Sequence, residues 1–246
     1  MIQVDNIYKS FDTKKILNGV SFSVEMGDKL AVIGQSGVGK SVLLKHLNGL
    51  LTPDKGNIII DQVKINKISY NELRNIRKNM SMVFQFGALL DSLTIGENIA
   101  LAFHENKKIT SKERNKKVLN SLELVGLEGT ENLMPSEISG GMKKRAGIAR
   151  AIVIEPKYIL YDEPTTGLDP INTDKINKLI NKVSNPEMAS IIVTHEIKTV
   201  YNVANKVVML YNGSIIFSGS PSDLKKTKNK FIQYFITGED MKDKVK

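Results

Sequence analysis

Apolar and polar positions alternate along the first 35 residues in the manner of β-strands. Turns of glycine or Asp-Thr-Lys separate the segments IQVDNI, GVSFSVEMGD and KLAVIG. The third segment ends in Gly34, and the VLLKHLNGLL beyond it has the apolar spacing of a helix. Two further strands are predicted at NIIIDQVKI (57–65) and MSMVF (80–84).

The pattern changes between about residues 86 and 155, where the strand signals disappear. SKERNKKVLNSLELVGL carries Val118, Leu122 and Val125 at helical spacing. Strand signals return after Pro156 as YILYD, ASIIVTH and KVVMLYNGSIIFSG, with a helix, DKINKLINKVS, between the first two. FIQYFITG is a short aromatic helix before a charged tail. Strands alternating with helices predict an α/β fold with a parallel sheet, into which the helical block is inserted.

Composition narrows the class of partner. The 246 residues are 41% hydrophobic and 25% charged, as in ordinary globular proteins, and their formal net charge is +9. This charge suits a nucleotide, a nucleic acid or lipid headgroups, although a lysine-rich proteome would produce the same balance. The absence of cysteine excludes disulfides and thiolate metal sites. MIQVDNIYKSF lacks the apolar region of a signal peptide, and no apolar run approaches membrane-spanning length. We therefore expect an intracellular chain that reaches a membrane only through a partner.

The segment GQSGVGKS (34–41) fits the pattern G-x-x-x-x-G-K-S between a predicted strand and a predicted helix. Its glycines allow backbone N–H groups to turn inward around a phosphate, and the helix N-terminus adds positive potential. Lys40 would reach the outer phosphates, and the Ser41 hydroxyl would bind Mg²⁺.

The strand YILYDEP (158–164) supplies two carboxylates for the same site. Asp162 is suited to hold the water shell of a metal ion, and Glu163 to polarise an attacking water. Both come at the carboxyl end of a strand, where ligands bind in open parallel sheets. The adjacent glutamate favours hydrolysis over phosphate transfer to a second substrate.

The segment PSEISGGMKKRAGIAR (135–150) predicts a second anion site. Ser139 is a good N-cap, and Gly140 and Gly141 leave room for close approach to the start of a helix. Four cations, Lys143, Lys144, Arg145 and Arg150, oppose the dipole of that helix. We expect them and the glycines to meet the triphosphate of a second copy of the chain. Met142 follows the spacing of Ala146, Ala149 and Val153 and is predicted to pack inward.

Taken in order, these segments resemble the ATP-binding subunit of ABC transporters over nearly the whole chain. GQSGVGKS is similar to the family's Walker A loop, Gln85 to its Q-loop, and ISGGM (138–142) to its signature. YILYDEP resembles Walker B, TGLD (166–169) the D-loop, and IIVTHE the switch that contains His195. The resemblance implies a P-loop NTPase (RecA-like) core with an N-terminal antiparallel β subdomain and an inserted α-helical subdomain.

The resemblance also implies boundaries. The ATP-binding domain would span residues 1–238, with a core of residues 1–85 and 156–225 and a helical insert of residues 86–155. Residues 226–246 would form a C-terminal helix and a charged tail, in which Phe231 and Phe235 are predicted to pack on their own chain.

The implied cofactors are ATP and Mg²⁺. Glu163 and His195 would be catalytic, and the metal ligands would be Ser41, Gln85 and Asp162. Phe11 falls where the family stacks a ring on adenine, although Tyr8 is close enough to compete for that role. His46 and His104 are interpreted as structural. The residues expected to contact nucleotide are Phe11, Gly34, Gln35, Ser36, Gly37, Val38, Gly39, Lys40, Ser41, Val42, Gln85, Ser139, Gly140 and Gly141.

FGALLDSLTIGENIA (86–100), together with Met142 where most of the superfamily has Gln, is similar to the ATPases of Mla-type and Mkl-like systems. That resemblance implies transport of phospholipid or other hydrophobic molecules. The implied partners are a second copy of the chain, an integral-membrane permease and an Mce-domain lipid-binding protein, with no nucleic acid. The implied location is the cytoplasmic face of the inner membrane, reached through the permease. Phe86, Leu89 and Leu90 would help to seat the permease, or would be buried within the insert.

Other classes fit the sequence less well. An ATPase of an importer for amino acids, metals or sugars is the nearest alternative, and its partners would distinguish it. Soluble ABC proteins of translation usually carry two cassettes, and those of DNA repair carry a long coiled coil; this chain has one cassette and no heptad run. A P-loop GTPase would need an N-K-x-D motif, which is absent, and would not explain Ser-Gly-Gly.

Overall fold

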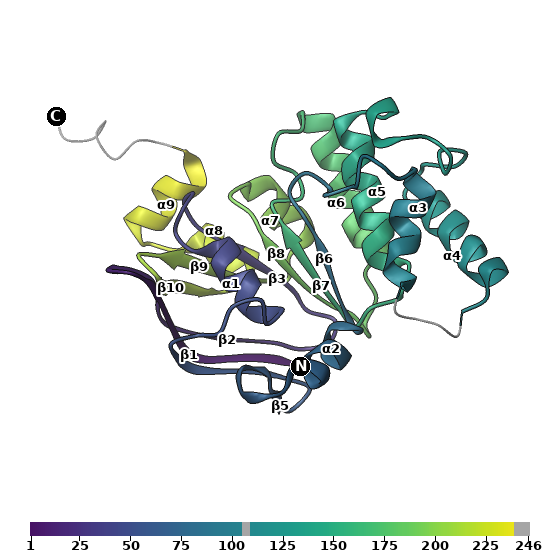
Figure 1. The fold of residues 1–246 in the computed structure, drawn as a ribbon. Helices are drawn as coiled ribbons and strands as arrows, with labels where there is room; N and C mark the ends of the chain where they lie inside the picture. The colour runs from purple at the N-terminus through teal and green to yellow at the C-terminus, as the bar shows by residue number, and fades with distance from the viewer. Residues whose placement is uncertain (105–108, 239–246) are drawn as a thin grey trace.

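Two β-sheets organise the computed structural model, which describes residues 1–104 and 109–238 (Figure 1). The N-terminal sheet is antiparallel, in the order β2-β1-β4-β5. Its strands are β1 (Ile2–Phe11), β2 (Lys14–Val24), β4 (Lys55–Ile60) and β5 (Val63–Lys64). The second sheet has the order β10-β9-β3-β8-β7-β6 and is parallel except for β10. Its strands are β3 (Lys29–Ile33), β6 (Met80–Val83), β7 (Tyr158–Asp162), β8 (Ala189–Val193), β9 (Lys206–Tyr211) and β10 (Ser214–Gly219).

Helices fill the space between the sheets and cover the parallel sheet. The helix α1 (Lys40–Leu47) lies between the two sheets, where Leu43, Leu44 and Leu47 are fully buried. The opposite face of the parallel sheet packs on helices of the lobe to the right in Figure 1. The remaining helices are α2 (Tyr70–Arg77), α3 (Ile95–Ala100), α4 (Ser111–Leu124), α5 (Gly140–Ile152), α6 (Pro170–Val183), α7 (Ile197–Val203), α8 (Pro221–Lys226) and α9 (Lys230–Thr237).

The predicted combination of a parallel α/β core, an N-terminal antiparallel sheet and inserted helices is confirmed. In the described part of the chain, only helices and loops connect β6 to β7, and α3, α4 and α5 lie in that connection. The side chains of these helices form one continuous core with Ile159 and Tyr161 of β7. The insert is therefore packed directly onto the strand that ends in Asp162.

The strand predicted over residues 57–65 is wrong in its second half. The chain turns at Asp61 and Gln62, whose φ angles are 47° and 68°, and returns as β5. Two consecutive residues with positive φ make a tight hairpin turn whose twist suits antiparallel strands. Asp-Gln is not the Asn-Gly or Asp-Gly pair that is typical of such a turn. The sequence pattern therefore predicted one continuous strand.

Helix lengths were also misjudged. The helix predicted over residues 42–51 ends at Leu47, because the Asn48 side chain accepts a hydrogen bond from the Leu50 N–H at 3.1 Å and Gly49 has a φ of 70°. The short helices α2, α3, α7 and α8 were not predicted, since each spans at most about two turns. Ser69, Thr94 and Ser220 nevertheless cap three of them through capping boxes, a signal visible in the sequence.

The C-terminal helix α9 packs on its own chain, as predicted. Phe231 and Phe235 contact the cluster around Ile33, Val207 and Met209, and the Phe231 ring lies 4.2 Å from that of Tyr211, measured between centroids. The charged tail, from residue 239 onward, lies outside the described residues. Among the helices that the structure describes, none has both the length and the apolar character needed to span a membrane.

The interpretation of His46 as structural agrees with its position on α1. Its side chain is fully buried, and Nδ1 donates a hydrogen bond to the Val42 carbonyl at 2.7 Å. Nε2 has no hydrogen-bond partner among the described residues. His104, in contrast, is exposed.

Burial lowers the pKa of His46, so the unfolded chain takes up a proton at this residue more readily than the folded one. The free energy of unfolding should therefore fall as the pH drops below about 6.5, the ordinary histidine value. Urea unfolding at pH 7.5 and at pH 5.5 checks this expectation on the wild type and on His46→Gln. The variant should lose less stability over this interval; an equal loss would contradict the prediction.

Candidate phosphate-binding and catalytic site

Parallel strand pairing brings the predicted site residues to one edge of the sheet. Val32 of β3 and Asp162 of β7 both lie opposite Val193 of β8. Beyond these pairs, the Glu163 N–H donates to the Val193 carbonyl at 2.9 Å, and the Thr194 N–H donates to the Val32 carbonyl at 3.2 Å. The loops that follow β3, β7 and β8 therefore leave the sheet side by side.

The loop after β3 encloses its own lysine. Gly39 caps α1 with a φ of 107°, and the exposed tip consists of Gln35, Ser36 and Gly37. Lys40 is only 6% exposed; its Nζ donates to the carbonyls of Gly34 at 2.8 Å and Gln35 at 3.1 Å. Val38 and Val42 pack on the core between the sheets. The lysine that should meet phosphate is thus held by backbone oxygens at the centre of the loop.

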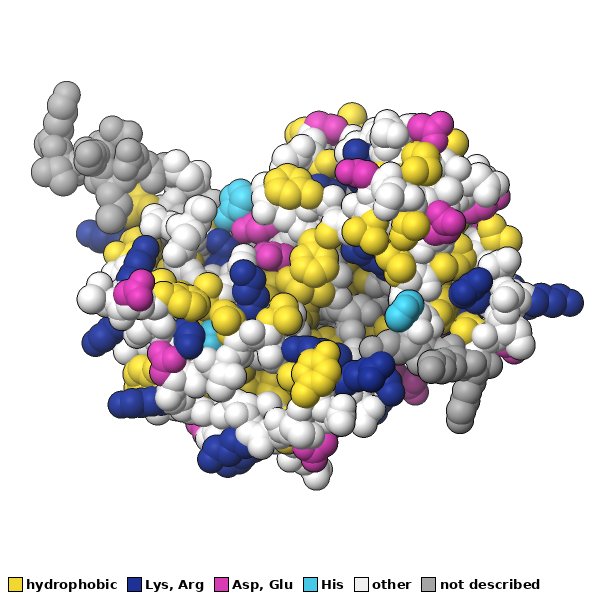
Figure 2. Space-filling model, in the orientation of Figure 1, with side chains coloured by type: hydrophobic (Ala, Val, Ile, Leu, Met, Phe, Trp, Pro, Cys, Tyr) yellow, Lys and Arg dark blue, Asp and Glu magenta, His cyan; other side chains and the backbone are white. Residues whose placement is uncertain are grey.

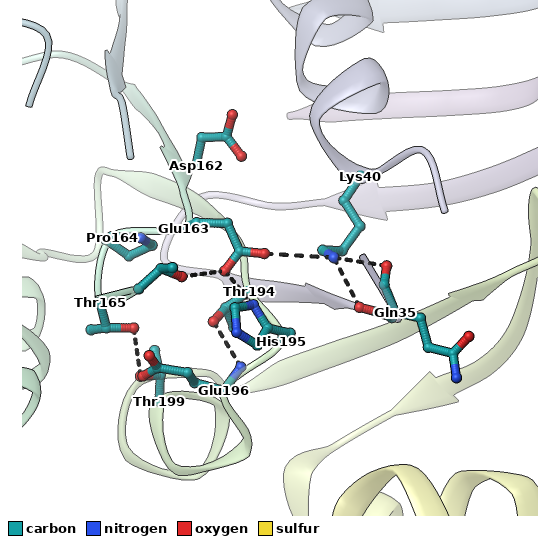
Figure 3. Close-up of polar contacts among 12 residues, drawn as sticks. Gln35, Lys40, Asp162, Glu163, Pro164, Thr165, Thr194, His195, Glu196 and Thr199 are labelled. Carbon is teal, nitrogen blue, oxygen red and sulfur yellow. Dashed lines mark hydrogen bonds and ion pairs between the residues drawn. The ribbon is translucent and has the colours of Figure 1, made fainter. Parts of the chain in front are cut away.

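Glu163 lies opposite this lysine and beside His195 (Figure 3). Its Oε1 is 3.5 Å from Lys40 Nζ, and its Oε2 is 2.9 Å from His195 Nδ1. The hydroxyl of Thr166 donates to the same Oε2 at 2.9 Å. The Glu163 side chain is 12% exposed and that of His195 is 50% exposed, so a small molecule can reach this pair from solvent.

Asp162 lies beside Ser41, as expected of two groups that share a metal ion. The Ser41 hydroxyl donates to Asp162 Oδ1 at 3.0 Å. Burial raises the pKa of the Asp162 carboxyl, and the charge of Glu163 raises it further. A cation would offset this concentration of negative charge, and hydroxyl and carboxylate oxygens are ligands that Mg²⁺ prefers. Ser41 and Asp162 therefore fit Mg²⁺.

Gln85 and Phe11 lie at the margins of this region. Gln85 is half-buried and lies two residues beyond Val83, which pairs with Tyr161 of β7. The loop that contains Gln85 therefore begins at the same edge of the sheet as the loop that contains Glu163. Phe11 ends β1 and is 43% exposed, with Lys9 Nζ 5.5 Å from its ring centroid. The competing Tyr8 has its hydroxyl against Gly19 in the adjacent strand β2. The exposed ring is therefore that of Phe11.

The segment Ser139-Gly140-Gly141 forms the start of α5, as predicted. The Ser139 hydroxyl accepts a hydrogen bond from the Met142 N–H at 3.3 Å. Neither glycine has a positive φ. A side chain at Gly140 would meet no atom of the described chain within 4 Å, and one at Gly141 would only touch Asn172. Met142 packs against the core of the insert, as predicted.

The prediction for the four cations of α5 is wrong for three of them. Lys144 donates to the carbonyls of Pro164 at 3.1 Å and Thr166 at 2.5 Å. Arg145 donates to the carbonyls that follow α4, at Val125 and Gly126. Arg150 donates to those of Gly87 and Ala88, in the loop beyond Gln85. These cations satisfy carbonyls of their own chain, which sequence spacing does not reveal.

The fold and site define an α/β protein with a loop for a phosphate chain and an adjoining carboxylate pair. A model of the ABC transporter family matches residues 17–166. The probable ribonucleotide transport ATP-binding protein mkl of Mycobacterium tuberculosis is 40% identical over 96% of this chain, which spans 66% of that relative. The intermembrane phospholipid transport system ATP-binding protein MlaF of Haemophilus influenzae is 35% identical over 97% of this chain and 91% of its own length.

The methionine import ATP-binding protein MetN of Staphylococcus saprophyticus is 37% identical over 99% of this chain and 72% of its own length. Among solved structures, the dimeric ATP-binding cassette MJ0796 with ADP and Pi has a TM-score of 0.82 and 30% identity, over 90% of this chain and 99% of that chain. The chain therefore belongs to the ABC transporter family and is an ABC ATPase.

Close packing makes Gly34 the least replaceable glycine of the phosphate loop. A Cβ there would lie 2.4 Å from the Leu210 carbonyl oxygen, whereas one at Gly37 would meet no described atom within 4 Å. Gly34→Ala should lower the free energy of unfolding by about 2 kcal/mol or more. Gly37→Ala, whose φ is 77°, should lower it by only about 1 kcal/mol. Chemical denaturation of both variants checks the order, and equal losses would contradict it.

Proposed function

We propose that the chain is the ATPase subunit of a membrane transporter that moves phospholipids or other hydrophobic molecules. The observation that carries this proposal is the extended similarity to the phospholipid transport ATPase MlaF, combined with an intact site at the sheet edge. Following the resemblance, residues 86–155 are the insert that contacts the permease, and residues 1–85 with 156–225 are the core that binds nucleotide.

In the proposed reaction Glu163 accepts a proton from the attacking water, and His195 orients the Glu163 carboxylate. Their contact at 2.9 Å places the two side chains in hydrogen-bond distance before any ligand binds. Lys40 now faces Glu163, and its ammonium turns toward the β- and γ-phosphates when ATP enters. The loop backbone from Gly34 to Val42 surrounds those phosphates, and Phe11 stacks on the adenine ring.

Mg²⁺ would be held by Ser41, Gln85 and Asp162, together with phosphate oxygens. When bound, the ion neutralises charge that develops on the phosphates during hydrolysis. Within the described residues no group of three or more His, Cys, Asp or Glu could hold a metal. The Ser41 hydroxyl and the Asp162 carboxylate would supply part of the shell, and a bound nucleotide would supply further oxygens.

The proposed enzyme works as a pair of identical chains. Figure 1 shows α1 between the sheets and α5 in the other lobe. Neither glycine at the start of α5 has a positive φ, and in the part of the chain that the structure describes no atom comes closer than 3.7 Å to a Cβ built on either, so a ligand from outside can approach them closely. We assign Ser139, Gly140 and Gly141 to the γ-phosphate bound by the second copy, which agrees with the dimeric form of the MJ0796 cassette.

A basic groove supports the proposed permease contact. It encloses about 980 Å³ between α2 and β6 on one side and the insert on the other, and Figure 2 shows it as a hollow bordered by blue and yellow side chains. Its lining includes Arg77, Lys78, Arg150 and the exposed Leu101. Of the residues predicted for docking, Phe86 is 75% exposed and Leu90 is exposed, whereas Leu89 packs into the insert. Phe86 and Leu90 remain available to a partner.

The proposed system also contains an Mce-domain lipid-binding protein. In this system the permease holds the chain at the cytoplasmic face of the inner membrane.

The similarity to MetN favours a second candidate, an importer of a small solute such as an amino acid. Its partners would include a solute-binding protein in place of the Mce protein.

Replacing Glu163 should separate hydrolysis from binding. Glu163→Gln should lower kcat for ATP hydrolysis about 100-fold or more, because the general base is lost, while ATP binding persists. Lys40→Met should instead weaken ATP binding by about 10-fold or more, because a charged hydrogen-bond donor to the phosphates is lost. Phosphate release and fluorescent-nucleotide titration measure the two effects. Full hydrolysis by Glu163→Gln would remove Glu163 from the catalytic role.

Disrupting the groove should release the membrane partner and spare the enzyme. Leu101→Asp places a carboxylate at an exposed apolar position of the groove, far from the phosphate loop in sequence. Purification of the tagged chain from detergent-solubilised membranes should recover permease and phospholipid with the wild type and little of either with the variant. The control Leu119→Asp changes an exposed leucine of α4 that is absent from the groove lining and should retain both. Recovery of a solute-binding protein would favour the second candidate.

A further inference from the structure

The turn that carries Glu163 has an unusual backbone. Glu163 has a φ of 50°, in the left-handed region that residues other than glycine rarely adopt. Such conformations persist where the surrounding structure determines them. The Thr166 N–H donates to the Glu163 carbonyl at 3.3 Å, and the Thr166 hydroxyl donates to the Glu163 carboxylate at 2.9 Å. Thr166 therefore contacts both the backbone and the carboxylate of Glu163, whose carboxylate also lies near Lys40 and His195.

Lys144 holds this turn from the other side. Its side chain is 6% exposed, and Nζ donates to the carbonyls of Pro164 at 3.1 Å and Thr166 at 2.5 Å. A buried ammonium is stable only with good partners, and a hydrogen bond from a charged donor is stronger than a neutral one. The two carbonyls flank Thr165, whose hydroxyl lies 3.2 Å from that of Thr199 on α7. Lys144 thus fastens the turn to α5.

We propose that Lys144 is a positioning residue for hydrolysis: it fixes Thr166, which in turn aims the carboxylate of Glu163. This inference rests on the proposed role of Glu163 as general base. Lys144 does not touch the nucleotide; it acts through backbone carbonyls, and any shift of its ammonium displaces the catalytic turn.

Lys144 also connects the catalytic turn to the helix whose start we assign to the phosphate of the second copy. It lies five residues beyond Ser139 on this helix. Because Lys144 connects α5 to the carbonyls of Pro164 and Thr166, a displacement of α5 would also displace the turn that carries Glu163.

Arg145 provides a matched control. It is the next residue of α5 and also donates to two backbone carbonyls, at 2.9 Å and 2.6 Å, but both lie in the insert beyond α4. Arg145→Met therefore removes a comparable pair of charged hydrogen bonds without touching the catalytic turn.

The test measures steady-state ATP hydrolysis and ATP binding for the full chain. Lys144→Met should lower kcat roughly 10- to 100-fold, since misplacement of a catalytic group by about 1 Å has effects of this size, with KM for ATP within about twofold of the wild type. Thr166→Ala should lower kcat in the same direction, and the double variant should be no slower than the slower single variant, because both changes act on Glu163 through one contact chain. Arg145→Met should keep the wild-type kcat.

Several results would overturn the inference: wild-type kcat in Lys144→Met, multiplicative losses in the double variant, or an equal loss in Arg145→Met. Thermal unfolding identifies a variant that fails to fold. If Lys144→Met does so, Lys144→Gln, which keeps an amide donor, takes its place, and wild-type kcat in that variant likewise overturns the inference. Glu163→Gln in the same assay separates the two hypotheses. Its full activity would refute the proposed function, whereas an inactive Glu163→Gln beside a fully active Lys144→Met would refute only the role of Lys144.

Discussion

The parallel pairing of β3, β8, β7 and β6 is the constraint on which the site depends. Parallel strands end together, so the loops that follow them emerge at one edge although they are far apart in sequence. The backbone bonds from Glu163 to β8 and from Thr194 to β3 extend the ladder by one step into the loops. Lys40, Asp162, Glu163 and His195 can then meet without any of the loops having to fold independently.

The site also depends on the helix α5, which contacts the loops beyond β6 and β7 from the side of the insert. The buried Lys144 and the partly buried Arg150 each donate to two backbone carbonyls, and these hydrogen bonds offset the cost of removing the cations from water. Arg150 holds the loop beyond Gln85, and Lys144 holds the turn beyond Glu163. One helix therefore contacts both the loop beyond Gln85 and the turn beyond Glu163.

The positive charge of Lys40 lies among the negative charges of Glu163 and Asp162 in the structure. Lys40 donates to carbonyls of its own loop and lies near Glu163, whereas Asp162 accepts a hydrogen bond from the Ser41 hydroxyl. Burial raises the pKa of the Asp162 carboxyl, and the nearby charge of Glu163 raises it further. A nucleotide with its metal would supply a cation to Asp162 and anionic oxygens to Lys40, which is the exchange that the proposed function requires.

The sequence by itself determined the class of protein, the order of the main strands and the longer helices, and the identity of the phosphate loop and its carboxylates. Those features depend on local patterns: apolar periodicity, glycines before a helix, and acids at the end of a strand. It did not determine the hairpin at Asp61, the end of α1, the short helices such as α2, or the partners of Lys144, Arg145 and Arg150. A short turn has too few residues to show a periodic pattern. The sequence also does not distinguish a cation that faces solvent from one that contacts a phosphate or a buried carbonyl. Only the packing of α5 against the loops beyond β6 and β7 and against the turn after α4 decided between these environments, because the carbonyls that these cations contact lie up to 63 residues away.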